Sequence, residues 1–351
     1  MSTFEIDPNI RKAKTLSAEF YTDERYFELS KEKIFARTWQ FLGKADEVEV
    51  LKPVTILPGF LDEPVLIVKS SESFSCLSNV CTHRGKILVE ESCNADLIRC
   101  SYHGRRFLLD GRCISMPEFE GVEGFPCESD NLQNLPFAER QGFLFTSIDP
   151  VDTFEAFVNG AAVRLDDVVH EGLRLTAMRE YEVSAHWALY CENYLEGFHI
   201  PYVHHGLNEV VDYGSYTTET FRYSSLQTGY SDVAANPTAG VPRFVSEVAA
   251  RYLFIFPNLM FNFYPWGISV NVVRPITPNK TVVEFLTYVR DETLLEKGAG
   301  ADLHTVEMED EAVVESVQRG IRSRFYSHGR YSPTREQGTH HFHRLIAEFM
   351  G

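Results

Sequence analysis

Two patterns of hydrophobic and polar positions follow one another along the chain. From about Thr38 to about Pro150, short runs of β-branched and aromatic residues, such as residues 65–69 and 142–146, are separated by Gly, Pro, Asp and Asn. Apolar runs of this length, bounded by turn residues, are typical of short β-strands. We therefore expect residues 38–150 to form a small all-β domain.

After Pro150 the pattern predicts longer elements. The turn residues Thr277-Pro-Asn-Lys280 predict a hairpin between the last two strand candidates. Residues 151–351 are therefore expected to form an antiparallel sheet flanked by long helices, and residues 1–37 a helical segment that packs on this second domain. The predicted fold class is α+β. The expected elements are helices at about 153–170 and 302–328 and strands at 176–185, 251–256, 268–275 and 281–290.

Composition and charge narrow the class of protein. The chain has 351 residues, 44% of them hydrophobic, which is ordinary for a globular protein of two domains. A formal net charge of −17 makes nucleic acid an unsuitable partner. The N-terminus lacks the apolar core of a secretory signal, and the apolar run from Tyr252 to Trp266 is interrupted by two prolines. We expect a cytoplasmic protein that binds neither membranes nor nucleic acid.

Two segments of the first domain each offer one thiol and one imidazole. They are Cys81-Thr82-His83-Arg84-Gly85 and Cys100-Ser101-Tyr102-His103-Gly104. Zinc also binds two cysteines and two histidines, but its usual loops pair like with like. In a Rieske [2Fe-2S] cluster, two cysteines hold one iron and two histidines hold the other. We expect Cys81 and Cys100 to bind the first iron and His83 and His103 the second.

The surroundings of these loops carry a second prediction. Basic residues outnumber acidic ones between Cys81 and Arg112, although the whole chain is acidic. An acidic electron donor such as a ferredoxin would be steered to such a patch. The alternative is that these are ordinary solvated side chains. The basic residues are Arg84, Lys86, Arg99, Arg105, Arg106 and Arg112.

A second group of possible ligands follows Glu196. His199 and His204 would not share one helical face, but Pro201 between them would end or kink a helix and let the chain fold back. Both histidines could then reach one metal, with His205 as a competing ligand. Two histidines and one carboxylate commonly hold a mononuclear iron that activates oxygen.

The carboxylate is predicted from the acidic helix at 302–328. The apolar stripe of this helix includes Val306, Val314 and Val317, and Asp310 falls within it at helical spacing. A carboxylate on a buried stripe needs a metal or cationic partner to offset its desolvation. Asp310 is therefore the predicted third iron ligand, whereas the neighbouring glutamates are expected to lie on a solvated face.

Taken in order, these motifs resemble the α subunit of Rieske non-haem iron oxygenases over essentially the whole chain. The resemblance implies a helix-grip catalytic domain, a homotrimer, and O2 as co-substrate. It also implies that Glu196 is a bridging carboxylate that couples the Rieske cluster of one subunit to the iron of its neighbour. Since the chain has no dinucleotide fingerprint, electrons from NAD(P)H would arrive through a ferredoxin, a flavin reductase or both.

Glutamate at the bridging position, where most members of that family have aspartate, resembles the carnitine oxygenase branch. Nearby strings also resemble enzymes that oxidise choline and glycine betaine. A small substrate with a trimethylammonium group is therefore expected, either hydroxylated or N-demethylated, with the aromatics between Tyr252 and Trp266 as a possible cage. The alternatives are an aromatic-ring hydroxylating dioxygenase and a Rieske electron carrier without oxygenase activity.

Overall fold

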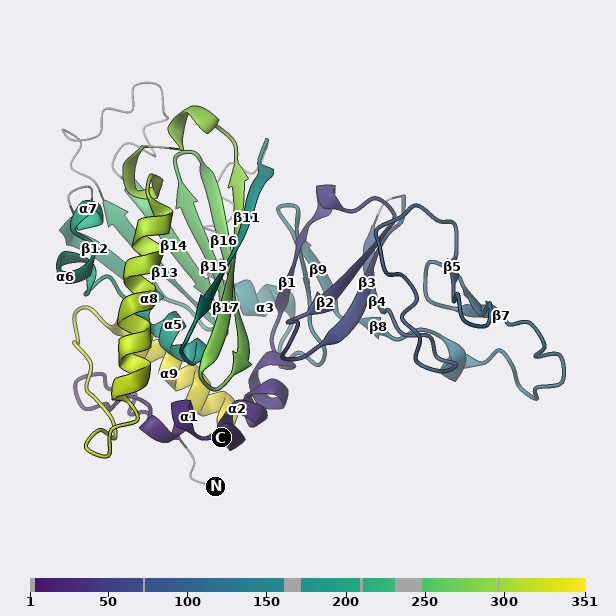
Figure 1. The fold of residues 1–351 in the computed structure, drawn as a ribbon, viewed down its shortest axis with the longest axis horizontal. Helices are drawn as coiled ribbons and strands as arrows, with labels where there is room; N and C mark the ends of the chain where they lie inside the picture. Colours follow the sequence, from purple (N-terminus) through teal and green to yellow (C-terminus); the bar gives the residue numbers. More distant parts are fainter. Residues whose placement is uncertain (1–3, 72, 161–171, 209–210, 231–247, 296) are drawn as a thin grey trace. The chain divides into compact units, whose positions relative to one another are not determined.

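The computed structural model describes residues 4–71, 73–160, 172–208, 211–230, 248–295 and 297–351 (Figure 1). The chain divides into two compact units, each described here by itself. One unit comprises residues 36–151, and the other combines the residues before 36 with those from 152 onward.

The smaller unit is built from short antiparallel strands. They form a four-stranded sheet in the order β2-β3-β4-β8 and two three-stranded sheets in the orders β1-β10-β9 and β5-β6-β7. Leu66, Leu77 and Phe107 lie in its core and are fully buried. The all-β prediction is confirmed. The strands are β1 (Gln40–Lys44), β2 (Leu51–Ile56), β3 (Glu63–Lys69), β4 (Phe74–Ser78), β5 (Ile98–Arg99), β6 (Arg106–Phe107), β7 (Cys113–Ser115), β8 (Asn134–Leu135), β9 (Phe137–Arg140) and β10 (Phe143–Thr146).

The larger unit holds a seven-stranded antiparallel sheet in the order β11-β17-β16-β15-β14-β13-β12. Helix α8 (Leu303–Gly320) runs across one face of this sheet, and α5 (Trp187–Tyr194) packs on both α8 and β16 (Figure 1). The predicted antiparallel sheet with long C-terminal helices is confirmed. The other elements are β11 (Arg174–Val183), β12 (Asp212–Thr220), β13 (Ser224–Tyr230), β14 (Val248–Ile255), β15 (Leu259–Tyr264), β16 (Gly267–Thr277), β17 (Lys280–Val289), α3 (Phe154–Val158), α6 (Ile200–Val203), α7 (His205–Asn208) and α9 (Gln337–Met350).

The N-terminal segment contributes helices α1 (Ala18–Thr22) and α2 (Glu24–Ser30) and a single π-helical turn, Lys31–Phe35. The ring of Phe35 meets the buried Trp187 of α5 edge-on, at 4.9 Å between centroids. The Tyr21 hydroxyl donates a 2.7 Å hydrogen bond to Glu192, also on α5. The segment therefore supports the helix from which part of the candidate site projects.

Two of the expected helices differ from those observed. Only α3 is described within the helix expected at 153–170, and residues 161–171 lie outside the described part of the chain. The helix expected to reach 328 ends at Gly320, because glycine is a poor helix former and the chain turns there, with the N–H of Ser323 bonded to the Gly320 carbonyl. The hairpin is confirmed, since Thr277 pairs with Lys280.

The buried face of α8 is more polar than its apolar stripe predicts. Val314 is buried as expected, but Val317 is 44% exposed, while Glu307 and Gln318 are only 4% and 3% exposed. Both polar side chains have partners in the interior. The side-chain oxygen of Gln318 accepts from the N–H of His186 at 2.7 Å, and the hydroxyl of Tyr190 donates to Glu307. The prediction that the glutamates lie on a solvated face is therefore wrong for Glu307.

Within the described residues, no helix has the length and apolar character needed to cross a bilayer.

Candidate metal centres

The two loops of the smaller unit that carry thiols and imidazoles share one backbone design. The N–H of Cys81 bonds to the carbonyl of Lys86, and the N–H of Cys100 bonds to that of Arg105. In each loop the glycine N–H then bonds back to the cysteine carbonyl. Gly85 and Gly104 adopt φ values of +72° and +75°, a conformation that favours glycine. This backbone requirement accounts for both glycines.

The donor atoms of these loops suit a metal cluster. The rings of His83 and His103 lie 4.9 Å apart, and Nδ1 of His103 is buried without a hydrogen-bond partner. Burial and the charges of His103 and Arg105 lower the pKa of His83, which favours the neutral, metal-binding imidazole. Burial opposes ionisation of Cys100, but hydrogen bonds from the backbone N–H of Tyr102 and the thiol of Cys81 outweigh it and lower its pKa, whereas burial raises the pKa of Cys81.

The spread of the four donors argues against a single zinc ion. Of the residues that the structure describes, only His199, His204 and Asp310 bring three metal-binding atoms within 4.8 Å of one another. Cys81 and Cys100 are buried with their thiols hydrogen-bonded to each other, whereas His83 and His103 are partly exposed and lie ring to ring, so the thiols and the imidazoles form two separate pairs. A binuclear cluster with two cysteines on one iron and two histidines on the other fits this arrangement.

The basic patch predicted around the cluster is smaller than the sequence suggests. Arg105 is only 2% exposed, because its guanidinium pairs with Asp130 and donates to the sulfur of Cys113 at 3.3 Å. Lys86 and Arg112 pair with Glu90 and Asp110. Arg112 stays exposed beside Asp110, and the other exposed arginines of the predicted set are Arg84, Arg99 and Arg106.

The second centre lies in the larger unit, where α6 connects His199 to His204. His199 is the N-cap of this four-residue helix and His204 its C-cap, so the two imidazoles leave opposite ends of one short turn. Pro201 starts the helix instead of ending it, which corrects the predicted role of this proline. His205 is exposed and stands outside the group, which removes it as a competing ligand.

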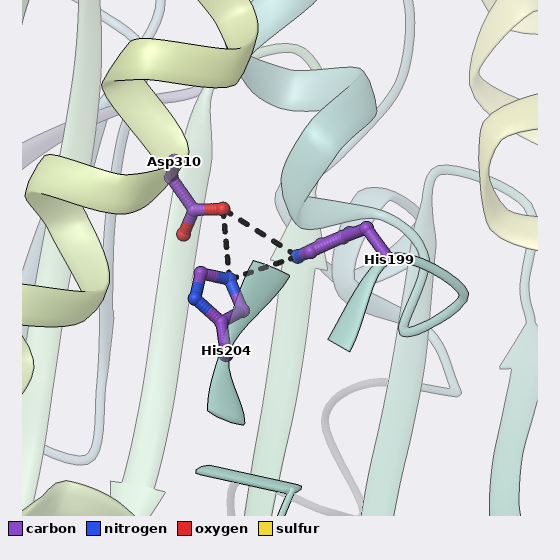
Figure 2. Close-up of side chains that lie close together, drawn as sticks. All are labelled: His199, His204 and Asp310. Carbon is purple, nitrogen blue, oxygen red and sulfur yellow. Dashed lines mark hydrogen bonds and ion pairs between the residues drawn. The ribbon is translucent and has the colours of Figure 1, made fainter. Parts of the chain in front are cut away.

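Figure 2 shows the two imidazoles and the carboxylate of Asp310 pointing toward one another. The Nε2 atoms of His199 and His204 are 3.1 Å apart, and Oδ1 of Asp310 lies 3.4 and 3.0 Å from them. Nδ1 of His199 is 2.7 Å from Glu196, and Nδ1 of His204 is 2.7 Å from Glu309. If each Nδ1 carries the proton that its carboxylate accepts, both Nε2 lone pairs and the Asp310 oxygen face one point, and a cation is needed there.

Neighbouring side chains hold the third donor in place. Asn193 of α5 donates a 2.5 Å hydrogen bond to Oδ1 of Asp310. Burial acts to lower the pKa of His204, but hydrogen bonds and charges from Asp310 and Glu309 outweigh it and raise that pKa. Sequence analysis assigned no role to Asn193 and predicted a solvated position for Glu309, whereas Glu309 contacts His204. The sequence shows only that Glu309 is next to Asp310. Its contact with His204 could not be predicted, because His204 lies more than a hundred residues earlier in the chain.

Glu309 therefore has a testable role as a positioning residue. Glu309→Ala should lower the affinity for iron roughly 10- to 100-fold, because His204 loses the acceptor that fixes its tautomer and ring orientation. Glu309→Gln, which keeps an acceptor, should lose less. Iron retained during titration with a chelator measures the effect, and sulfide content should stay constant. Glu311→Ala, a neighbour on α8 outside the group, is the matched control; equal iron affinity in all variants would remove this role.

A pocket opens onto the second centre and is lined by His199, His204 and Asp310. Five tyrosines also line it, and burial raises the pKa of each, so all are neutral. The ring of Tyr252 meets those of Tyr194 and Tyr264 edge-on, at 6.3 and 6.2 Å between centroids. Of the aromatic run 252–266, only Tyr252 and Tyr264 reach the pocket; Phe254, Phe256, Phe261, Phe263 and Trp266 are buried elsewhere. The five tyrosines are Tyr190, Tyr194, Tyr216, Tyr252 and Tyr264.

Glu196 and Glu307 are the remaining carboxyl groups of the pocket lining. Glu196 accepts from the backbone N–H groups of Phe198 and His199 and contacts Nδ1 of His199. Burial raises the pKa of Glu307 to about 8, against the opposing effect of the hydrogen bond from Tyr190.

Comparisons with known proteins agree with these two centres. The family model of the Rieske [2Fe-2S] domain matches residues 38–126, and that of the ring hydroxylating alpha subunit catalytic domain matches residues 170–351. Choline monooxygenase of Arabidopsis thaliana is 31% identical, covering 97% of this chain and 85% of its own length. The carnitine monooxygenase oxygenase subunit of Acinetobacter baumannii is 30% identical, covering 96% of this chain and 95% of its own length.

A solved structure extends this similarity to three dimensions. The quaternary ammonium Rieske monooxygenase CntA in complex with L-carnitine superimposes with a TM-score of 0.80 at 28% identity, over 98% of this chain and 97% of that one. The chain therefore belongs to the Rieske non-haem iron oxygenase α subunits, in the branch that contains choline and carnitine monooxygenases.

Proposed function

We propose that this oxygenase inserts oxygen into a C–H bond of a small quaternary ammonium compound, at an iron held by His199, His204 and Asp310. One observation carries the proposal: the pocket that ends on these three side chains is lined by neutral tyrosine rings and by carboxyl groups. Ring faces attract a cation and leave its alkyl groups in an apolar environment. A quaternary ammonium ion has both properties.

The ligand roles follow from the geometry of the donors. Cys81, Cys100, His83 and His103 would hold the Rieske cluster, and His199, His204 and Asp310 the mononuclear iron. When bound, these groups supply stored electrons and the site of oxygen activation. Glu196 and Glu309 accept the Nδ1 protons of the two histidines and fix the directions of their Nε2 lone pairs. The tyrosines exclude water and hold the substrate.

The reaction balances with two electrons and two protons from outside the pocket. One oxygen atom of O2 enters the substrate and the other leaves as water. If the C–H bond belongs to an N-methyl group, the hydroxymethyl product breaks down to formaldehyde, a tertiary amine and a proton. The electrons would come from NAD(P)H through a flavin reductase, a ferredoxin or both.

Glu196 would couple the two centres across a homotrimer. Its Oε1 already contacts Nδ1 of His199 at 2.7 Å. A carboxylate in that position can also accept from an imidazole of the partner subunit's cluster, either His83 or His103. The structure of one similar protein, a quaternary ammonium Rieske monooxygenase, is described as giving insight into inter-subunit electron transfer in that protein.

A single turnover tests the proposed reaction without the unidentified reductase. The protein, loaded with both iron centres and reduced chemically, should convert at least one trimethylammonium compound when O2 is admitted. Mass spectrometry should find formaldehyde with a demethylated amine, or a hydroxylated product carrying one atom of labelled oxygen. A panel of simple arenes serves as the comparison. Oxygenation of arenes alone would contradict the quaternary ammonium proposal and favour ring hydroxylation.

A further inference from the structure

The pocket contains one buried carboxyl group that no cation of the described chain neutralises. Glu307 lines the pocket and is only 4% exposed. The Tyr190 hydroxyl lies 2.9 and 2.7 Å from its two oxygens, and no ion pair to Glu307 is found among the described residues. Burying a carboxylate is costly unless it is paired, so Glu307 favours its protonated form in the empty pocket, and a cation beside it would favour the ionised form.

The other two carboxyl groups of the pocket already have partners. Glu196 is bonded to His199, and Asp310 contacts both metal-binding histidines and Asn193. Both belong to the candidate iron centre. Glu307 lies one helical turn before Asp310 on α8 and makes no bond to either histidine in the described structure. It is therefore available to a ligand in the pocket.

The charge of the pocket is one-sided. The described residues that line it include three carboxyl groups and no lysine or arginine. A zwitterionic substrate would bring a carboxylate into a cavity that offers it no basic partner from these residues. A substrate with a positive head group and a neutral polar end meets no such conflict, because Asn262, Ser269 and Asn271 supply polar contacts.

We propose that Glu307 is the counter-ion of the substrate, so that this pocket selects a quaternary ammonium ion without a carboxylate group. The inference rests on the proposed function and deepens it. The tyrosine rings favour the size and apolar character of the head group, whereas Glu307 distinguishes a charged head group from a neutral one of the same shape. Glu307 is thus assigned a role in specificity and none in holding metal.

Binding to the metal-loaded enzyme tests this assignment. Titration calorimetry would compare choline, its uncharged analogue with carbon in place of nitrogen, and the zwitterion glycine betaine. Wild-type protein should bind choline at least about tenfold more tightly than either of the other two compounds. Losing one buried ion pair is expected to change the dissociation constant by at least this factor. Glu307→Gln should weaken choline binding at least about tenfold and leave the uncharged analogue unaffected.

Two further variants make the result unambiguous. Glu311→Gln removes the same charge from the same helix outside the pocket lining and should bind choline as wild type does. Glu307→Asp keeps the charge and should retain the preference for choline over its uncharged analogue. Iron and sulfide content and thermal unfolding confirm that each variant is folded and loaded.

The outcomes separate this inference from the proposed function. If Glu307→Gln binds choline as tightly as wild type, or if wild type binds glycine betaine more tightly than choline, the assignment of Glu307 is overturned while the quaternary ammonium function stands. If the wild-type enzyme binds no ammonium compound, the proposed function fails and this inference fails with it.

Discussion

Asp310→Ala should remove the mononuclear iron and reduce turnover to the uncatalysed background. Asp310 supplies the carboxylate oxygen that faces both Nε2 atoms, at 3.4 Å from His199 and 3.0 Å from His204. Without this carboxylate, only two neutral imidazoles would remain to bind the iron, and the site would lose its negatively charged oxygen ligand. Iron analysis should therefore find one iron fewer per chain.

The same variant should leave the Rieske cluster intact, because the cluster donors belong to a separate compact unit. Sulfide content and the visible absorption of the cluster measure this. Glu311→Ala, the next residue on α8, is the matched control and should keep all of its iron. If Asp310→Ala retained the full iron content, the third ligand would have to be another residue, and the reading of this centre would be wrong.

Glu196→Gln should leave both centres loaded while turnover driven by the reductase falls by about 100-fold. Oε1 of Glu196 is bonded to the His199 imidazole, and Oε2 accepts two backbone N–H groups. An amide can keep the first bond but cannot provide the negative charge that would join this imidazole to one on the partner subunit. The loss should therefore affect electron transfer more than iron binding.

Hydrogen peroxide separates these two explanations, since it supplies both oxygen and electrons and bypasses the cluster. Turnover with peroxide should be nearly equal in Glu196→Gln and wild type. Glu196→Asp should recover part of the reductase-driven rate, because it keeps the charge one methylene further away. Equal losses with peroxide and with the reductase would indicate that Glu196 only supports the local structure of α6.

The cluster loops were the part of the site most accessible from the sequence. All four donors lie within 23 consecutive residues, and their Cys-x-His and Cys-x2-His spacing reflects a backbone design that is local to each loop. The extent of the basic patch could not be predicted from the sequence in the same way. Arg105 is buried by Asp130, which lies 25 residues further along the chain.

The second centre was predictable only for its metal-facing side chains. The position of Asp310 on the apolar stripe was informative because a buried carboxylate needs a partner. The same logic failed for Glu307. The predicted apolar stripe included Val317, which is exposed, so the buried face of the helix was placed incorrectly and Glu307 was left outside it. The carboxyl partner of His204 is Glu309, more than a hundred residues further along the chain, and helical periodicity does not contain that information.

Helix α8 carries both the proposed counter-ion, Glu307, and the proposed iron ligand, Asp310, one turn apart. The rise of an α-helix places Glu307 and Asp310 about 4.5 Å from each other along its axis. If the positive nitrogen is held near Glu307, the C–H bonds that can reach the iron are those on the carbons bonded to that nitrogen, or on the next carbons along the substrate. The rigid spacing of two acidic side chains would thus govern regioselectivity, and lengthening the substrate chain should not shift the site of attack away from the ammonium end.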